Sequence, residues 1–229
     1  PTPDRPNTEV NSDNEPTRFQ RKAQHRPEQP TSRQDVTITV ELNDPDGIHD
    51  VLIACQVVAP GNYIPLRYPR SISAMNDNPD IISNLSVQYA AEANWQYTAM
   101  LDDGTNGDAL ANDQVYTAVF PAQEHRSLVR YRITATDLHG ASVTVPYPED
   151  ASMNYAYFVY NGVPDYQGFS SEVMESLPVY HLITREHDLR QALGWDGQNR
   201  ISQGAPAWFV YNWYGTLVYD GVVYDNIRY

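Results

Sequence analysis

Cysteine is almost absent from this chain. Cys55 stands alone among 229 residues, so no disulfide can form within the chain. Its apolar neighbours predict a small buried hydrophobic side chain rather than a reactive thiol. Long apolar runs are absent too. None approaches the roughly 20 residues of a membrane-spanning helix, so the sequence predicts no insertion into a membrane.

Positive charge is scarce as well. The sequence has 15 Lys and Arg against 29 Asp and Glu, which gives a formal net charge of -14 at pH 7. DNA, RNA and anionic membranes are negatively charged themselves, so this balance argues against all three as partners. An acidic surface favours solubility and the binding of cations. No signal peptide is visible, and the sequence begins at Pro1, so we interpret the chain as a fragment or a processed product.

Recognisable catalytic motifs are missing. No Gly-x-Gly-x-x-Gly or phosphate-binding loop occurs, and Ser170-Ser171 lacks the glycines of a nucleophile elbow. His181, Glu186 and His187 do not have the His-Glu-x-x-His spacing, and on a strand followed by a helix they would diverge. Surface or partly buried histidines are therefore favoured over a zinc site. These residues predict no cofactor for the chain itself.

Alternation of apolar and polar residues is the clearest pattern that is present. In residues 128–137 the apolar positions are Val129, Tyr131, Ile133 and Ala135, and the polar positions between them are Arg130, Arg132, Thr134 and Thr136. A period of two is typical of a strand with one buried and one solvated face. Further strand-like runs cover residues 36–42, 95–100, 115–120, 141–145 and 155–160, and residues 51–58 form a continuous apolar run broken only by Gln56, as in a central strand. The sequence therefore predicts a mainly β fold, with an immunoglobulin-like antiparallel β-sandwich over residues 16–160.

Two polar segments flank the predicted sandwich. Residues 1–15 are rich in Pro, Asn, Asp and Glu, and they have too few apolar side chains to offset the entropy of ordering. Residues 161–176 contain glycine, proline and paired serines. We interpret both segments as linkers.

Residues 177–229 predict a partial α+β segment. A strand-like run covers residues 177–183, and a short helix is expected at residues 185–193. Near the end, two apolar runs flank Asp220-Gly221, which is a strong hairpin signal. The sequence stops inside an expected strand, so we expect this segment to be the incomplete start of a further domain.

Acidic residues cluster in two predicted turns. Crowded carboxylates suit Ca²⁺, but neither cluster has the spacing of a helix-loop-helix calcium loop. Asp is also a common turn former, so turn formation is favoured over metal binding. A calcium site is the alternative, and its candidate ligands are Asp44, Asp46, Asp102, Asp103, Asp108 and Asp113.

A long predicted loop covers residues 59–94. Loops of this length are usually functional or mobile. Tyr63, Tyr68 and Tyr89 could form a partner-binding surface, which would make the chain a carbohydrate- or protein-binding module. Packing of these tyrosines onto the sandwich is the favoured interpretation.

The C-terminal sequence resembles the start of a CotH (spore-coat protein H) kinase-like domain. The resemblance lies in Leu177-Pro-Val-Tyr-His-Leu-Ile-Thr-Arg185 and in Tyr211-Asn-Trp-Tyr-Gly-Thr-Leu-Val-Tyr-Asp-Gly-Val-Val-Tyr-Asp-Asn-Ile-Arg-Tyr229. Similar domains in large secreted bacterial proteins follow an immunoglobulin-like module. Asp44-Pro-Asp-Gly47 and Asp102-Asp-Gly-Thr-Asn-Gly-Asp108 fit that arrangement.

The resemblance implies a protein partner and a secreted or cell-surface location in a bacterium. CotH-like proteins are atypical kinases that use ATP and a divalent metal, but their nucleotide-binding residues lie mostly beyond the opening hairpin. No catalytic residue is therefore carried over to this chain. We expect a non-catalytic structural module that displays or docks a CotH-like domain, and a fragment of an active kinase is the alternative.

Overall fold

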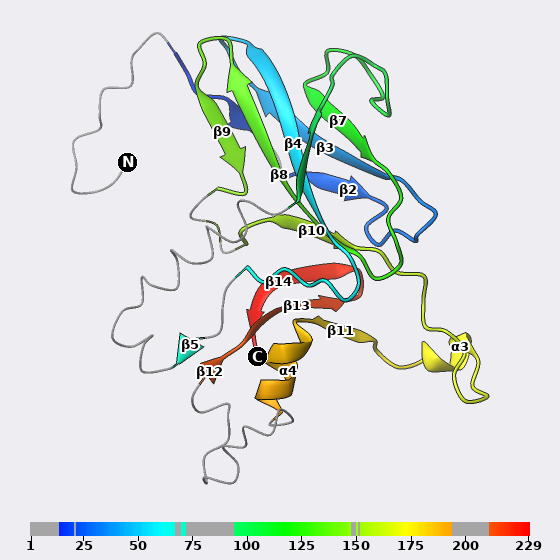
Figure 1. Ribbon diagram of the computed structural model, residues 1–229. Coiled ribbons are helices and arrows are strands. Elements are labelled where there is room, and N and C mark those ends of the chain that lie inside the picture. The colour runs from blue at the N-terminus through cyan, green and yellow to red at the C-terminus, as the bar shows by residue number, and fades with distance from the viewer. Residues whose placement is uncertain are drawn as a thin grey trace.

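The computed structural model describes residues 14–20, 22–66, 70–71, 94–147, 150, 152–193 and 211–229 (Figure 1). Within these ranges the chain is mainly β, and the paired strands are antiparallel. This confirms the mainly β fold that the alternation of side chains predicted. Most of the predicted linker 1–15 lies outside the described residues.

Four strands form the first sheet. The long strand β3 lies at its centre, β1 and β2 follow one another along one of its edges, and β7 pairs along the other. The β3–β7 register runs from Val36 opposite Phe120 to Glu41 opposite Val115. The strands are β1 (Arg18–Phe19), β2 (Gln24–Arg26), β3 (Val36–Asn43) and β7 (Val115–Phe120).

Five strands form the second sheet. β4 is central and pairs with β6 on one side and with β8 on the other. The far edge of β8 is shared, because β9 pairs with one half of β8 and β10 with the other half. The strands are β4 (Ile48–Val58), β6 (Trp95–Ala99), β8 (Leu128–Asp137), β9 (Ser142–Val145) and β10 (Tyr155–Phe158).

One apolar core fills the space between these two sheets, which together are called the sandwich below. On β8 the inward side chains are those of Val129, Tyr131, Ile133 and Ala135, each at most 1% exposed. The predicted buried face of residues 128–137 is therefore confirmed. Cys55 lies in the same core, and burial raises the pKa of its thiol to about 12. The predicted burial of Cys55 is thus confirmed, and the raised pKa disfavours the thiolate form.

A third sheet, called the C-terminal sheet below, lies beneath the sandwich in Figure 1. Asp220 and Gly221 both have positive φ, at 49° and 74°, as the tight hairpin turn between β13 and β14 requires. The predicted hairpin is thus confirmed. The strands are β11 (Tyr180–Ile183), β13 (Tyr214–Tyr219) and β14 (Val222–Arg228).

Short elements complete the fold. The predicted linker 161–176 contains the single-turn helix α3 (Ser171–Met174), and the predicted helix 185–193 is present as α4 (Glu186–Ala192). Two-residue strands β5 (Arg70–Ser71) and β12 (Tyr211–Asn212) pair with each other. Tyr68 and Tyr89 of the predicted long loop lie outside the described residues.

Candidate functional site

The C-terminal sheet packs on the outer face of the second sheet, next to β10 (Figure 1). A small apolar cluster marks this interface, with Val58, Leu128 and Phe158 from the sandwich and Val218 from β13. All four side chains are at most 2% exposed. Tyr63, at the start of the long loop, packs against the same cluster. Three parts of the chain that are distant in sequence therefore meet here.

Arg130 lies inside this interface with its side chain fully buried, at 0% exposure. The prediction of a solvated face for β8 is wrong at this position, because the C-terminal sheet covers it. The guanidinium Nε and Nη2 donate to the two carboxylate oxygens of Asp225 at 2.8 and 3.1 Å. Nη1 donates to the side-chain oxygen of Gln56 at 3.1 Å and to the carbonyl of Ile64 at 2.8 Å.

A β-bulge in the hairpin aims Asp225 at the sandwich. The register of β13 and β14 shifts just after Gly215, and Asn226 adopts a positive φ of 61°. Bulges of this kind redirect side chains locally. Thr216 and Asp225 consequently lie on the same side, where the Thr216 hydroxyl donates to Asp225 Oδ1 at 2.5 Å.

Tyr63 extends the network from the loop side. Its hydroxyl lies 3.2 Å from Thr216 Oγ1, and its ring centre lies 5.5 Å from the Arg130 guanidinium carbon. Burial raises the pKa of Tyr63, so the hydroxyl stays protonated and serves as a hydrogen-bonding group. The favoured interpretation, in which loop tyrosines pack onto the sandwich, is confirmed for this residue.

The chemistry of this network is suited to a permanent structural contact between the sandwich and the C-terminal sheet. Asp225 neutralises the charge of Arg130 in a bidentate ion pair. The third guanidinium nitrogen, Nη1, donates to the side-chain oxygen of Gln56 and to the carbonyl of Ile64. A buried pair is tolerated only with such geometry, and removal of one partner typically costs about 3–5 kcal/mol. The network therefore specifies how the C-terminal sheet sits on the sandwich.

Sequence reasoning identified neither Arg130 nor Asp225 as functional. Arg130 occupies a polar position of the β8 alternation, which by itself indicates solvent. Asp225 offered the better signal, because it is an acidic residue next to an apolar hairpin. Their pairing could not be predicted, since 95 positions separate them in the sequence.

His181, weighed above as a zinc ligand, lies at the edge of this interface among aromatic rings. Its ring centre is 5.0 Å from that of Phe158 and 4.5 Å from that of Tyr160. Burial lowers the pKa of His181, so its imidazole is neutral at pH 7. Glu186 forms an ion pair within α4, and the side chain of His187 lies outside the described structure.

Three of the six predicted calcium ligands come together in the turn between β6 and β7. Asp102, Asp108 and Asp113 each place a carboxylate oxygen within 4.8 Å of the others. The carboxylates also accept backbone hydrogen bonds, as at Asp108 from the Gly104 amide at 2.7 Å and at Asp102 from the Gln114 amide at 3.0 Å. Turn formation and metal binding use the same residues here, so calcium binding stays a prediction.

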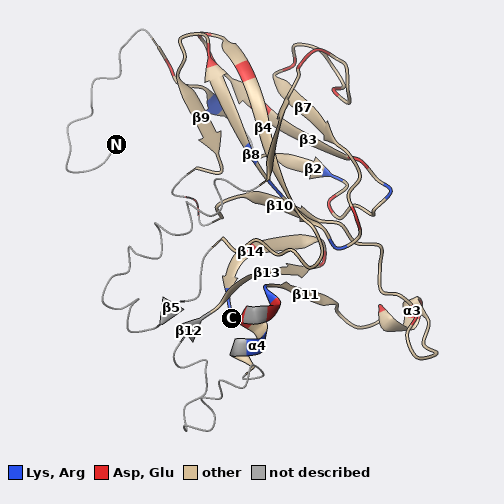
Figure 2. Cartoon of the chain, viewed as in Figure 1, with Lys and Arg blue, Asp and Glu red and all other residues tan. Residues whose placement is uncertain are grey.

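The other three predicted ligands are not in this group. Asp44 accepts from the Thr17 hydroxyl at 2.7 Å and from the Asp46 amide at 2.9 Å, and Asp103 accepts from the amide and hydroxyl of Thr105. These are ordinary turn contacts of aspartate. Among the described residues, no second group of three or more potential ligands is close enough to hold a metal. Figure 2 shows the acidic turns at the end of the sandwich farthest from the C-terminal sheet.

Comparison with known proteins adds no family assignment. A scan against models of protein families found no match, and a search of curated proteins found none. In the part of the chain that the structure describes, no helix has both the length and the apolar character to cross a membrane. The function is therefore inferred from the geometry of the interface.

Proposed function

We propose that this chain is a non-catalytic structural and interaction module in which the sandwich holds the C-terminal sheet in one orientation. The observation that carries the proposal is the buried pair of Arg130 and Asp225. A shift of the sheet by one residue would leave an unpaired charge in a dry site, so the pair selects one register. Apolar contacts around Val218 supply the attraction between the two parts.

The sequence resemblance extends this proposal to neighbouring domains. β11, β13 and β14 coincide with the segments that resemble the start of a CotH kinase-like domain. Under the proposal, the sandwich is an immunoglobulin-like module that displays or docks that domain in a secreted or cell-surface bacterial protein. The division of its strands between two antiparallel sheets supports the immunoglobulin-like assignment.

Hydrogen exchange followed by mass spectrometry tests the docking. Amides of β13 and β14 should exchange slowly in the wild-type chain. Arg130→Met should speed their exchange by at least about tenfold, while β3 and β7 keep their protection. The proposal fails if the hairpin of the wild-type chain exchanges at the rate of unfolded peptide.

A kinase assay tests the enzyme alternative. The purified chain is incubated with radiolabelled ATP, Mg²⁺ or Mn²⁺, and casein as a general protein acceptor. The groups at the interface are paired with one another and buried, so we expect no phosphate transfer. Robust labelling of casein or of the chain itself would overturn the non-catalytic assignment.

A further inference from the structure

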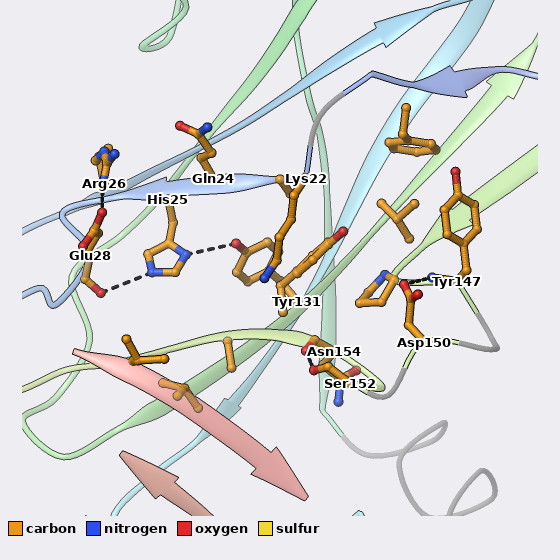
Figure 3. A pocket seen from close by; sticks show the side chains of 18 of the residues that line it. Lys22, Gln24, His25, Arg26, Glu28, Tyr131, Tyr147, Asp150, Ser152 and Asn154 are labelled. Carbon is orange, nitrogen blue, oxygen red and sulfur yellow. Dashed lines mark hydrogen bonds and ion pairs between the residues drawn. The ribbon is translucent and has the colours of Figure 1, made fainter. Parts of the chain in front are cut away.

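An open cleft of about 850 Å³ lies on one side of the sandwich (Figure 3). One wall is formed by residues of β1 and β2 and their described neighbours, and the opposite wall by residues 145–147, 150, 152 and 154–156. The turn between β13 and β14 closes a third side with Gly221, Val222 and Val223. This volume falls within the roughly 300–1,000 Å³ of typical small-ligand sites.

Aromatic side chains supply the apolar part of the cleft. Phe19, Tyr131, Tyr147 and Tyr155 all line it. Tyr131 lies at the base of the cleft, where its hydroxyl is 3.0 Å from Nδ1 of His25, and its ring is buried in the core (Figure 3). Tyr147 is 44% exposed at the rim, so its ring has a free surface. Flat rings at the wall and the rim of an open cleft are suited to stacking on a ring-shaped ligand.

The charged side chains of the cleft balance one another. Arg26 and Glu28 form an ion pair on one wall. The other two ionised residues are Lys22 and Asp150, one positive and one negative. Two charges of each sign leave no net charge to attract a strongly anionic or cationic ligand.

His25 adds polarity without charge. Its ring lies between the Tyr131 hydroxyl and the Glu28 carbonyl oxygen, the latter at 3.2 Å from Nε2. Burial lowers the pKa of His25, which keeps the imidazole neutral at pH 7. The cleft therefore combines aromatic rings and neutral polar groups with charges that balance, among them the Lys22 ammonium 5.7 Å from the centre of the Tyr155 ring.

We propose that this cleft binds a short, uncharged saccharide. A sugar ring has an apolar face that stacks on aromatic side chains and a rim of hydroxyls that donate and accept hydrogen bonds. Gln20 lines the cleft with an amide that can donate and accept, and Ser152, whose hydroxyl donates to the Asn154 carbonyl at 2.6 Å, can accept from such hydroxyls. A purely apolar ligand would strip water from these groups without replacing its hydrogen bonds. A highly charged ligand would find no excess of opposite charge.

This site is separate from the Arg130–Asp225 pair, and its test does not disturb that pair. Isothermal titration is performed on the wild-type chain with β-1,4-linked hexamers of glucose, N-acetylglucosamine and mannose. A trimer of galacturonate serves as the charged comparison. At least one neutral hexamer should bind with a Kd below about 1 mM, and more tightly than the galacturonate trimer.

Variants locate the binding in the cleft. Tyr147→Ala, at the rim, should weaken binding of that hexamer by at least about tenfold, and Gln20→Ala, on the opposite wall, should weaken it severalfold. Tyr97→Ala is the matched control, because Tyr97 is 69% exposed on β6 and does not line the cleft. Far-UV circular dichroism checks that each variant is folded. The proposal is overturned if no neutral hexamer binds at about 10 mM, if the galacturonate trimer binds best, or if folded Tyr147→Ala binds like wild type.

Discussion

Replacement of Arg130 by methionine removes one half of the buried ion pair and leaves the other half in place. The side chains of Arg130 and Asp225 are 0% and 2% exposed, so water cannot solvate a carboxylate left without its partner. Truncation of one partner of such a pair costs about 3–5 kcal/mol. For a chain of this length that loss corresponds to a fall in Tm of roughly 6–20 °C.

The double variant Arg130→Met/Asp225→Leu separates pairing from packing. Apolar side chains of similar size often replace a buried pair without loss. The Gln56 side-chain oxygen and the Ile64 carbonyl lose the Arg130 donor in both variants, so the double variant should be clearly less destabilised than Arg130→Met without equalling wild type. Thr216 keeps a hydrogen-bonding partner in Tyr63. The free energy of unfolding is measured by urea denaturation, with hydrogen exchange in β13 and β14 as a local probe.

Arg190→Met is the matched control. Arg190 pairs with Glu186 one helical turn away on α4, and both side chains are more than half exposed. Its removal should change stability by no more than about 0.5 kcal/mol. The reasoning is refuted if Arg130→Met costs less than about 1 kcal/mol, or if the double variant loses the sum of the two single losses.

Three further outcomes are expected. A Cβ at Gly215 would lie 2.8 Å from the Ile183 carbonyl oxygen on β11. Gly215→Ala should therefore destabilise the protein by about 1–3 kcal/mol. An unchanged midpoint of urea denaturation would contradict this close approach of β11. Burial lowers the pKa values of His25 and His181, so the unfolded chain takes up protons first as pH falls below about 6.5, and stability decreases with acidification. The fall in Tm between pH 7.5 and 5.5 should be smaller in folded His181→Gln, and an equal or larger fall would count against a neutral buried imidazole. Finally, an excess of chelator should lower the Tm of the wild-type protein, because it removes the bound Ca²⁺. Asp108→Asn should abolish this effect of the chelator, and Asp103→Asn should leave it unchanged. Identical melting curves with and without chelator would leave the acidic residues as turn formers alone.

The sequence by itself determined the strands and the tight turn near the end. Side chains of neighbouring residues point to opposite faces of a strand, so the alternation in residues 128–137 specified which side chains enter the core. Asp220 and Gly221 tolerate positive φ, so the position of the hairpin was also fixed locally. Burial of Cys55 followed from its own apolar neighbours.

The tertiary structure decided what happens to polar residues outside the core. Arg130 and Arg132 occupy equivalent positions in the alternation, yet only Arg130 is completely buried, because only it lies under the bulged hairpin. Three acidic residues of the β6–β7 turn meet while Asp44 and Asp46 bond elsewhere, and the cleft walls come from segments more than a hundred residues apart. Backbone conformation depends on near neighbours in the chain. Whether a polar side chain faces water, a partner or a ligand depends on which distant segment covers it.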